Sequence, residues 1–520
     1  GFSKIKTLNN VTGIQNIQEN EFSPIYFSPA LKQLTKTMLN GLYLSSTIYT
    51  NVFSDNVAGL KCFWLKTTLA YEDNSFENSF VNTIFEFDTY GNLTKKVVNI
   101  NNIEDIATTY SIESVAANVV PYKIISKSTT FTRLLNPGYT TKTDYSYFTN
   151  GKLFMETRFP GLSKQVDTKH QYNLLGNNIS TSILASGLIT RKTTSVYDDK
   201  GRFPIESYNP LVQKSEAKFD PKFGNINYKK GINTLITTYE YDTWGRLKKT
   251  KLPKGISISE SYGWDINTNE GTVYFYLTTH PGKPDIKIWY DQLGRERKRQ
   301  MEGFANDWIT TITNYDYKGN IASKTAPYKN GEPISTVTKI YDNYNRVQSE
   351  RKAFGSEINI TTNNFSYSNE GNLTISTTDP SGQISSKITD AAGKLLSATD
   401  YGGTLTYVYN YQGNVAQVGN GSQNMVFNEF DEYGRQKKLT DLNAGTTQYV
   451  YDAFGQLTQQ ISALNQTTNI NYDLLGRETF NLGPEGGTET QYYPSNSGTS
   501  TNQIKKIIGF SNDIQEFTYD

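Results

Sequence analysis

The chain has 520 residues, more than the roughly 250 to 300 at which a single hydrophobic core stops growing, so it is either several domains or a repeat array. Its 51 lysines and arginines nearly balance 50 aspartates and glutamates, so no basic field attracts nucleic acid. A single cysteine, Cys62, excludes an intrachain disulfide, and two histidines, His170 and His280, are too few for a zinc site built mainly from Cys and His.

The first 86 residues carry no repeated pattern and are predicted to form a cap or plug region. A short helix is predicted over residues 28–41, where Ser28 and the following proline resemble a helix start. A second helix is predicted around residues 103–118. Such elements could plug an open end or fill an interior, because the terminal parts of repeat arrays need caps.

From residue 87 to residue 520 one short pattern recurs: an aromatic residue, usually Asp, two variable residues, Gly, and then Arg or Asn. The turn glycines follow one another at steps of 20 to 26 residues over most of this range, so the chain is a repeat array. The clearest copies are Tyr241, Asp242, Gly245 and Arg246; Tyr290, Asp291, Gly294 and Arg295; Tyr451, Asp452 and Gly455; and Tyr472, Asp473, Gly476 and Arg477.

Each repeat unit is predicted to be a β-hairpin. Residues 235–241 alternate an apolar and aromatic face with a mixed face, which is typical of a strand. Asp242 can accept hydrogen bonds from N–H groups inside the turn, and Gly245 supplies the positive φ that closes a short hairpin loop. Asn345 stands at one glycine position, and asparagine is the residue that next best tolerates this backbone conformation.

The number of hairpins constrains the architecture. Some 15 hairpins make about 30 strands, whereas twisted open sheets rarely exceed about ten strands without curling or splitting. We therefore predict an all-β fold, in which residues 87–520 form a long antiparallel β-hairpin repeat ribbon coiled into a spiral or hollow cocoon-like shell. Residues 1–86 are the non-repeat N-terminal region, and we expect one or two helices in this part of the chain.

Tyr-Asp-x-x-Gly-Arg-Leu at this spacing resembles the YD repeat of the RHS/teneurin superfamily, over about residues 87–520. The resemblance implies a large hollow β-sheet shell. In the bacterial branch, such shells hold a toxic C-terminal polypeptide for delivery through a secretion system or as part of an insecticidal toxin complex. In animals, related shells belong to cell-surface adhesion proteins.

The family's bacterial shells usually end in a self-cleavage segment with Asp-Pro-x-Gly-Leu signatures. Asp379 begins a similar fragment, Asp-Pro-Ser-Gly, but the fragment is followed by Gln383 and lies in the middle of the array. No protease role is therefore assigned to Asp379. The resemblance implies that a cleavage segment and any payload lie beyond residue 520 or are absent.

Several candidate residues have a second interpretation. The turn aspartates could act as carboxylate pairs in glycoside hydrolysis, but every unit repeats them, which favours turn capping. The arginine after the turn glycine could bind an acidic partner, although pairing with turn aspartates and stacking on tyrosine is favoured. The tyrosines could line a wet cavity or stack on sugars, with cross-strand pairing as the plainer interpretation. His170 and His280 are predicted to be structural, and Cys62 to be a buried small hydrophobe.

The leading hypothesis is a non-enzymatic shell segment that encloses or carries a toxin-like C-terminal polypeptide for secretion and delivery. Its expected partners are that polypeptide or another enclosed protein and the secretion machinery, and we expect a secreted or cell-surface location. No catalytic residue, cofactor, metal, nucleic acid or transmembrane segment is expected. The alternative is an extracellular adhesion or glycan-binding protein that uses the coiled sheet as a scaffold to bind a cell-surface glycan or receptor. A glycoside-active enzyme is the third hypothesis.

Overall fold

The computed structural model describes most of the chain, and all of its strands belong to one antiparallel β-sheet. Within the described residues there is no α-helix, and a 3₁₀ turn lies at Pro253–Gly255. Cys62, both ends of the first predicted helix (residues 28, 39 and 40) and the C-terminal end of the second (residues 114–118) lie outside the described residues. The described ranges are 3–9, 13–22, 29–38, 41, 43–54, 64–74, 77–88, 91–113, 123–134, 138–304, 307–494, 500–510 and 513–519.

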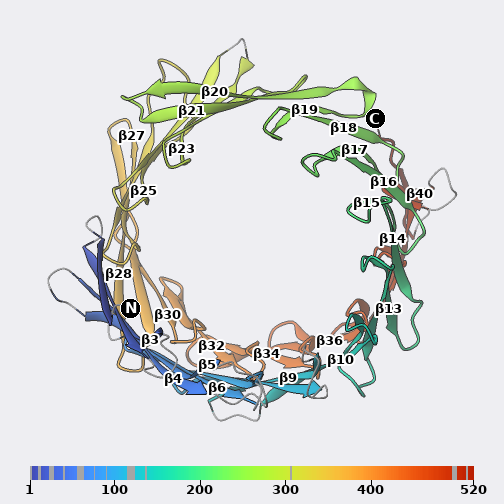
Figure 1. Cartoon of the computed structure of the whole chain (residues 1–520), viewed down its shortest axis with the longest axis horizontal. Helices are drawn as coiled ribbons and strands as arrows, with labels where there is room; N and C mark the ends of the chain where they lie inside the picture. Colours follow the sequence, from blue (N-terminus) through green and yellow to red (C-terminus); the bar gives the residue numbers. More distant parts are fainter. Residues whose placement is uncertain are drawn as a thin grey trace. The chain divides into compact units, whose positions relative to one another are not determined.

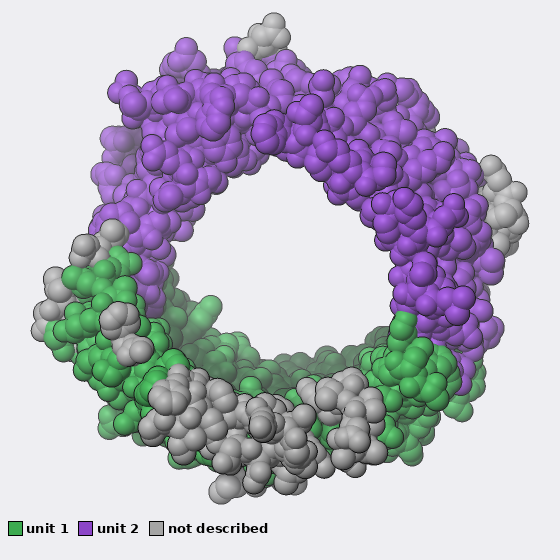
Figure 2. Space-filling view, in the orientation of Figure 1, with its two compact units in different colours: residues 1–168, 185–188, 363–468 green, residues 169–184, 189–362, 469–520 purple. Residues whose placement is uncertain are grey.

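Strands that follow one another in the chain are paired as antiparallel neighbours, for example β6 with β7 and β35 with β36. The predicted antiparallel β-hairpin ribbon is confirmed. The chain divides into two compact units, which Figure 2 shows in different colours. Unit 1 comprises residues 1–168, 185–188 and 363–468, and unit 2 comprises residues 169–184, 189–362 and 469–520.

Unit 1 contains strands from two distant stretches of the chain, which follow the same arc in Figure 1 in blue to cyan and in orange. Its strands are β1 Lys4–Asn9, β2 Ile14–Phe22, β3 Pro29–Met38, β4 Tyr43–Ser54, β5 Trp64–Asn74, β6 Ser79–Phe87, β7 Leu93–Ile100, β8 Glu104–Glu113, β9 Lys123–Arg133, β10 Tyr139–Tyr147, β11 Leu153–Arg158, β29 Leu373–Thr378, β30 Ile384–Thr389, β31 Leu395–Asp400, β32 Gly403–Tyr409, β33 Val415–Gly419, β34 Asn424–Phe430, β35 Gln436–Asp441, β36 Gly445–Tyr451 and β37 Leu457–Ile461.

The remaining strands belong wholly or in part to unit 2. They are β12 Val166–Tyr172, β13 Asn178–Ala185, β14 Arg191–Tyr197, β15 Pro204–Tyr208, β16 Lys214–Phe219, β17 Ile226–Lys230, β18 Ile236–Tyr241, β19 Leu247–Lys251, β20 Ser257–Asn267, β21 Thr272–Thr279, β22 Ile286–Tyr290, β23 Glu296–Glu302, β24 Trp308–Tyr315, β25 Ile321–Thr325, β26 Thr336–Tyr341, β27 Val347–Phe354, β28 Glu357–Tyr367, β38 Thr467–Tyr472, β39 Glu478–Gly483, β40 Gly486–Pro494, β41 Ser500–Ile508 and β42 Ile514–Glu516.

Both helix predictions are wrong. Residues 29–38 form β3, which pairs with β2 on one side and β4 on the other, and β8 occupies residues 104–113. The apolar spacing in β8 also fits alternation, since Ile106 and Ile112 are an even number of positions apart. In β3, Leu31 and Leu34 are three positions apart, and the pairing with β2 shifts register between them. An isolated helix of this length is marginal in water, whereas each strand satisfies its backbone groups on both sides. The predicted boundary between the N-terminal region and the repeat array at residue 86 stays a prediction. In the structure, β6 runs across this position and forms a hairpin with β7.

The sheet has very little core. Among the described residues, the buried hydrophobic side chains are Ala30, Leu44, Val166, Ile288 and Trp289. The accessible surface is 31106 Å², whereas a compact globular protein of this mass exposes about 19,000 Å². Over most of its length the sheet is therefore a single layer, and both of its faces are partly accessible.

Candidate functional site: the repeat turns and the seam of unit 1

The repeat turn is closed by a fixed set of hydrogen bonds, as the turn that begins at Asp242 shows. The Gly245 N–H donates to the Asp242 carbonyl over 3.0 Å, and Asp242 Oδ1 accepts the N–H groups of Trp244 and Arg246. The Arg246 guanidinium donates to Asp242 Oδ2 over 2.7 Å. Gly245 has a φ of +78°, a conformation that is costly for most residues with a Cβ, so glycine is favoured here.

The other predicted turns repeat this arrangement. Each turn glycine has a positive φ, Asn345 takes the same conformation at +64°, and the strand register shifts by one residue beside the turn, as in a β-bulge. The capping bonds join Asp291 to Leu293 and Arg295, Asp452 to Gln456, and Asp473 to Leu475 and Arg477; the turn glycines are Gly294, Gly455 and Gly476.

The tyrosine before the turn ties each hairpin to the one before it. The Tyr451 hydroxyl donates to the Gln436 carbonyl over 2.9 Å, and Tyr241 donates to the Ile226 carbonyl over 2.7 Å. In both cases the carbonyl belongs to the second residue after the preceding turn glycine. The same bond is made by Tyr315, Tyr341, Tyr409 and Tyr492, while Tyr290 stacks on Tyr274 and Tyr472 ends β38 at the equivalent place.

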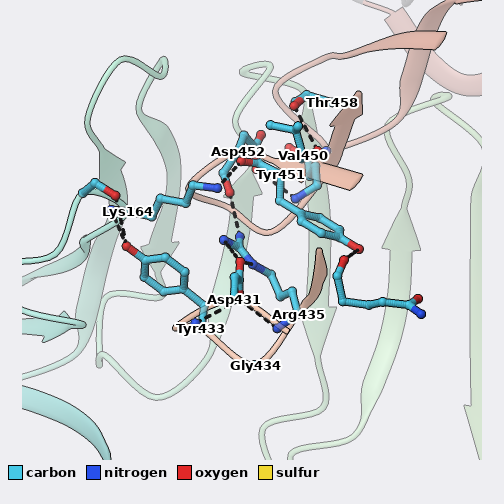
Figure 3. Close-up of polar contacts among 12 residues, drawn as sticks. Lys164, Asp431, Tyr433, Gly434, Arg435, Val450, Tyr451, Asp452 and Thr458 are labelled. Atoms are coloured by element: carbon cyan, nitrogen blue, oxygen red, sulfur yellow. Dashed lines mark hydrogen bonds and ion pairs between the residues drawn. The ribbon is translucent and has the colours of Figure 1, made fainter. Parts of the chain in front are cut away.

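The residue after the turn glycine connects neighbouring turns. Arg435 pairs with Asp431 in its own turn, stacks on Tyr451 of the next hairpin at 5.0 Å, and donates to the Asp452 carbonyl over 2.9 Å (Figure 3). Asn225 donates to the Gly245 carbonyl in a similar way. The turns are therefore linked into a row. The stacking distances of the other predicted arginines are 4.7 Å for Arg246 on Tyr262, 4.4 Å for Arg295 on Tyr315 and 3.8 Å for Arg477 on Tyr492.

The pKa values of Asp291, which caps a repeat turn, and of Tyr451, which precedes one, are shifted away from the range that acid–base catalysis uses at neutral pH. Burial would raise the pKa of Asp291, but the N–H groups of Arg295 and Leu293 and the Arg295 guanidinium outweigh it and hold the pKa below its ordinary value. Burial raises the pKa of Tyr451. At neutral pH Asp291 is therefore charged and Tyr451 neutral, which suits capping better than proton transfer.

A ribbon of hairpins has two edges: the repeat turns lie at one, and the loops that lack the repeat motif lie at the other, which we call the non-motif edge. Within unit 1, the repeat turns of residues 363–468 contact loops at the non-motif edge of residues 1–168, and we call this contact the seam. The Lys164 N–H donates to the Tyr433 hydroxyl over 2.9 Å, and Lys164 Nζ donates to the Tyr451 carbonyl over 2.6 Å (Figure 3). The Tyr433 ring packs edge-on against Phe159 at 4.9 Å. The side chain at the third position of this repeat turn is therefore held in the seam.

A buried ion cluster lies at another point of the seam. Arg133 pairs with Asp390, the capping aspartate of a repeat turn, and with Glu104; the side chains of Arg133 and Asp390 are 4% and 3% exposed. The Arg133 guanidinium also stacks on Tyr409 at 5.4 Å. Because both charges are removed from water, removing one partner leaves the other unpaired at high cost.

The seam residues were missed by sequence analysis. Asn101 donates to the Glu370 carbonyl and Asn78 to the Ser368 carbonyl, both in one repeat turn, across more than 260 residues of chain. The residues on the 1–168 side follow no repeated spacing. The periodicity of the sequence predicts local hairpins, but it does not indicate which loops contact one another when they are more than 260 residues apart in the chain.

The other residues that the sequence analysis considered for a functional role, Asp379, His170 and His280, have polar partners nearby in the chain. Asp379 Oδ1 accepts hydrogen bonds from Ser381 and Gln383 within its own turn. His170 Nδ1 lies 3.1 Å from Asn178 Nδ2, and His280 Nδ1 lies 2.8 Å from the carbonyl oxygen of the next residue. In the part of the chain that the structure describes, no group of three or more His, Cys, Asp or Glu could hold a metal ion, and no helix could span a membrane.

Comparison with known proteins identifies the fold. No family model and no curated protein matches the sequence. The crystal structure of TcdB2-TccC3 matches 98% of this chain with a TM-score of 0.73 at 12% sequence identity. The crystal structure of TcdB2-TccC3-TEV also matches 98% of this chain, with a TM-score of 0.74 at 10% sequence identity. The structure of TcdB2-TccC3 without its hypervariable C-terminal region matches 99% with 0.70 at 10% identity. This chain covers 36%, 40% and 43% of those chains. The likeness confirms the fold that the RHS/YD-repeat resemblance predicts.

Proposed function

We propose that this chain is a segment of a protein shell that encloses or carries another polypeptide for secretion and delivery. One observation carries the proposal: the sheet is a single layer of 31106 Å² accessible surface, in a fold shared with TcdB2-TccC3 along 98% of the chain. Such a sheet is stabilised through its turns and hydrogen bonds rather than through a core. Its faces are therefore available to a second molecule.

The side chains of the sheet suit loose contact with an unfolded chain. Tyrosine offers a large apolar body with a polar tip, and here several tips are engaged by backbone carbonyls, so the rings stay in place. A surface of fixed rings can contact many sequences without requiring one of them. We propose no catalytic role for the chain itself.

We propose that the passenger is the protein's own C-terminal polypeptide. The support for this proposal comes from one of the similar proteins, TcdB2-TccC3, which has a hypervariable C-terminal region. A variable passenger on a constant shell requires that the shell recognise no particular passenger sequence, which is what the repeated turns and rings provide.

Limited proteolysis of the full-length gene product tests the proposal. We expect the polypeptide that follows the shell to resist a nonspecific protease, and to be cut rapidly when expressed alone or when the shell is unfolded in urea. Equal cleavage rates for the attached and isolated polypeptides would contradict enclosure. The fold of the shell is checked in parallel by circular dichroism.

Exposed tryptophans favour the alternative of glycan binding. Trp244 and Trp264 are each 80% exposed in unit 2, and aromatic faces stack on sugar rings. Glycan-array binding that is lost in the double variant Trp244→Ala/Trp264→Ala would support adhesion. Absence of binding in the unmodified chain would reject it.

A further inference from the structure

The overall balance of charge conceals a local excess of positive charge in unit 2. The whole chain carries 51 lysines and arginines against 50 aspartates and glutamates, whereas residues 191–251, which form β14 to β19, carry 13 against seven. These strands are consecutive antiparallel neighbours, drawn in green in Figure 1, and form one continuous piece of sheet. The excess is therefore concentrated in space as well as in sequence.

One row of side chains crosses this piece of sheet from strand to strand. Lys218 in β16 lies opposite Tyr228 in β17, which lies opposite Thr238 in β18. Thr238 in turn lies opposite Lys251 in β19, and Lys251 lies opposite Ser257 in β20. Residues opposite one another in neighbouring strands project from the same face, so we call these five residues the lysine row. Its two lysines are three strand spacings apart, about 14 Å.

Both lysines of the row are available to an anion. Lys218 is exposed, lies over the Tyr228 ring at 5.1 Å and has no acidic partner in the part of the chain that the structure describes. Lys251 Nζ lies 2.6 Å from Glu240 Oε1, and 48% of its side chain is exposed. An exposed ion pair of this kind contributes little stability, so Lys251 can exchange its partner for another anion.

Two hydroxyl groups lie between the lysines. Tyr228 and Thr238 are half-buried, and among the described residues their hydroxyls form no hydrogen bond with another side chain or with the backbone. The Tyr241 hydroxyl, by contrast, donates to the Ile226 carbonyl. Because a hydroxyl can both donate and accept, the row presents a cation, two hydroxyls, a second cation and the hydroxyl of Ser257 in sequence.

Two glutamates restrict the shape of an anionic partner. Glu216 lies two residues before Lys218 in β16, and Glu240 lies two residues after Thr238 in β18. Both therefore project from the same face as the lysine row, one on each side of it. A broad anionic surface such as a lipid bilayer would meet these carboxylates, whereas a narrow chain along the row contacts the lysines without covering them. The row thus fits a linear polyanion.

An acidic polysaccharide matches the row more fully than a nucleic acid does. Its acid groups can pair with the lysines, and its hydroxyls can bond with those of Tyr228 and Thr238. Single-stranded nucleic acid binds largely by stacking its bases on aromatic rings, but the ring of Tyr228 already has Lys218 over it. Trp244, in the turn that joins β18 to β19, is 80% exposed, and its face can stack on a sugar ring.

We propose that the lysine row of unit 2 binds a linear acidic polysaccharide, which lies across β16 to β20 with carboxylate or sulfate groups on Lys218 and Lys251. The proposal does not depend on the enclosure of a passenger. It narrows the glycan-binding alternative to acidic glycans that are recognised by the sheet face. Binding should weaken as the salt concentration rises, because a polyanion releases counterions when it pairs with lysines.

Titration calorimetry of the purified protein with dextran sulfate and with polygalacturonate tests the proposal. We expect both to bind at low salt and neutral dextran not to bind. The double variant Lys218→Gln/Lys251→Gln should weaken binding by about tenfold and flatten its salt dependence. The double variant Tyr228→Phe/Thr238→Val removes hydroxyls alone, so it should weaken binding several-fold and leave the salt dependence unchanged.

The double variant Lys229→Gln/Lys248→Gln is the matched control. It also removes two exposed lysines from β17 and β19, but these residues alternate with Tyr228 and Lys249 and so lie on the opposite face. It should bind like the unmodified protein. Melting followed by circular dichroism checks each fold, and Lys218→Gln alone, which breaks no ion pair, replaces the double variant if that variant does not fold.

Three results would overturn the proposal. The first is that neither acidic polysaccharide binds to the unmodified protein. The second is that the control loses as much affinity as Lys218→Gln/Lys251→Gln. The third is that double-stranded DNA or phosphatidylserine vesicles bind as tightly as dextran sulfate and with the same dependence on these lysines. Binding of a neutral glycan through Trp244 without binding of dextran sulfate would also overturn it, while leaving the glycan-binding alternative intact.

Discussion

The two stretches of chain in unit 1 form the same antiparallel sheet by different means. In residues 1–168 the strands are long, with 12 residues in β4 and 11 in β5. In residues 363–468 they are short, with 5 residues in β33 and 7 in β34. Long strands fix their pairing through many ladder bonds, whereas short strands need a turn that sets the register.

This difference explains where the repeat motif is needed. Asp431 and its equivalents cap each short hairpin, and the following arginine, asparagine or lysine links it to the next turn. The seam then joins the turn edge of the short strands to the loops of the long ones. Stability in residues 363–468 should therefore depend on turns and seam, and in residues 1–168 on strand length.

The largest effect is expected from breaking the ion cluster of the seam. Arg133→Ala leaves the buried Asp390 and the partly exposed Glu104 without their cation, which should lower the free energy of unfolding by about 3 to 5 kcal/mol. Urea unfolding followed by circular dichroism measures the loss. The double variant Arg133→Met/Asp390→Asn, which removes both buried charges, should recover much of it. A single variant as stable as the unmodified chain would show that the seam adds nothing to unit 1.

A smaller effect is expected from a single turn glycine. Gly455 has a φ of +85°, and a Cβ there would meet no atom within 4 Å, so Gly455→Ala introduces backbone strain alone. The expected loss is about 1 to 2 kcal/mol. Gly231→Ala is the control, because its site is equally open and its φ is not in the positive range. Equal melting temperatures for the two variants would contradict the role of the turns in fixing the register.

The fold was predictable to the extent that its signals are local. The Tyr-Asp-x-x-Gly pattern encodes a strand end, a capping carboxylate and a positive φ within five residues, and the structure places Tyr241, Asp242 and Gly245 in these roles. The same logic failed for β3 and β8. The apolar spacing of β8 fits a helix as well as a strand, and a register shift interrupts the alternation in β3. Pairing with strands on both sides decided between helix and strand in both segments.

The seam was not predictable from the sequence. Arg133 ends β9 and Lys164 lies in the loop between β11 and β12, neither belongs to the repeat motif, and their partners Asp390 and Tyr433 follow more than 250 residues later. The sequence shows that Asp390 caps a turn but not that an arginine lies against it. Only the arrangement of the two stretches in unit 1 brings these side chains together.

The bond between consecutive hairpins provides a finer test of the short-strand region. Tyr451→Phe removes the hydroxyl that donates to the Gln436 carbonyl and keeps the ring on which Arg435 stacks, so a loss of about 1 kcal/mol is expected. Tyr401→Phe, at a 92% exposed turn position, should change the free energy of unfolding by less than about 0.5 kcal/mol. The same urea titration compares them, and a reversed order would contradict the proposed linkage of hairpins through tyrosine.

The smallest effect is expected from the charge of a single capping carboxylate. Burial opposes the ionisation of Asp342, but the Arg346 and Tyr344 N–H groups and the Arg346 guanidinium hold its pKa below the ordinary value. A carboxylate whose pKa is lower in the folded state stabilises the fold above its unfolded pKa of about 3.9, and this contribution is lost as the pH falls through the folded pKa. Asp342→Asn should therefore reduce stability at pH 7 by less than about 1 kcal/mol and flatten the decline in melting temperature below pH 4. An acid-induced loss of structure should therefore begin at the turns of unit 2 that Asp291, Asp316 and Asp342 cap, as hydrogen exchange resolved by segment can measure. Protection that persists at these turns while the strands beside them exchange would contradict the role of the capping carboxylates in acid stability.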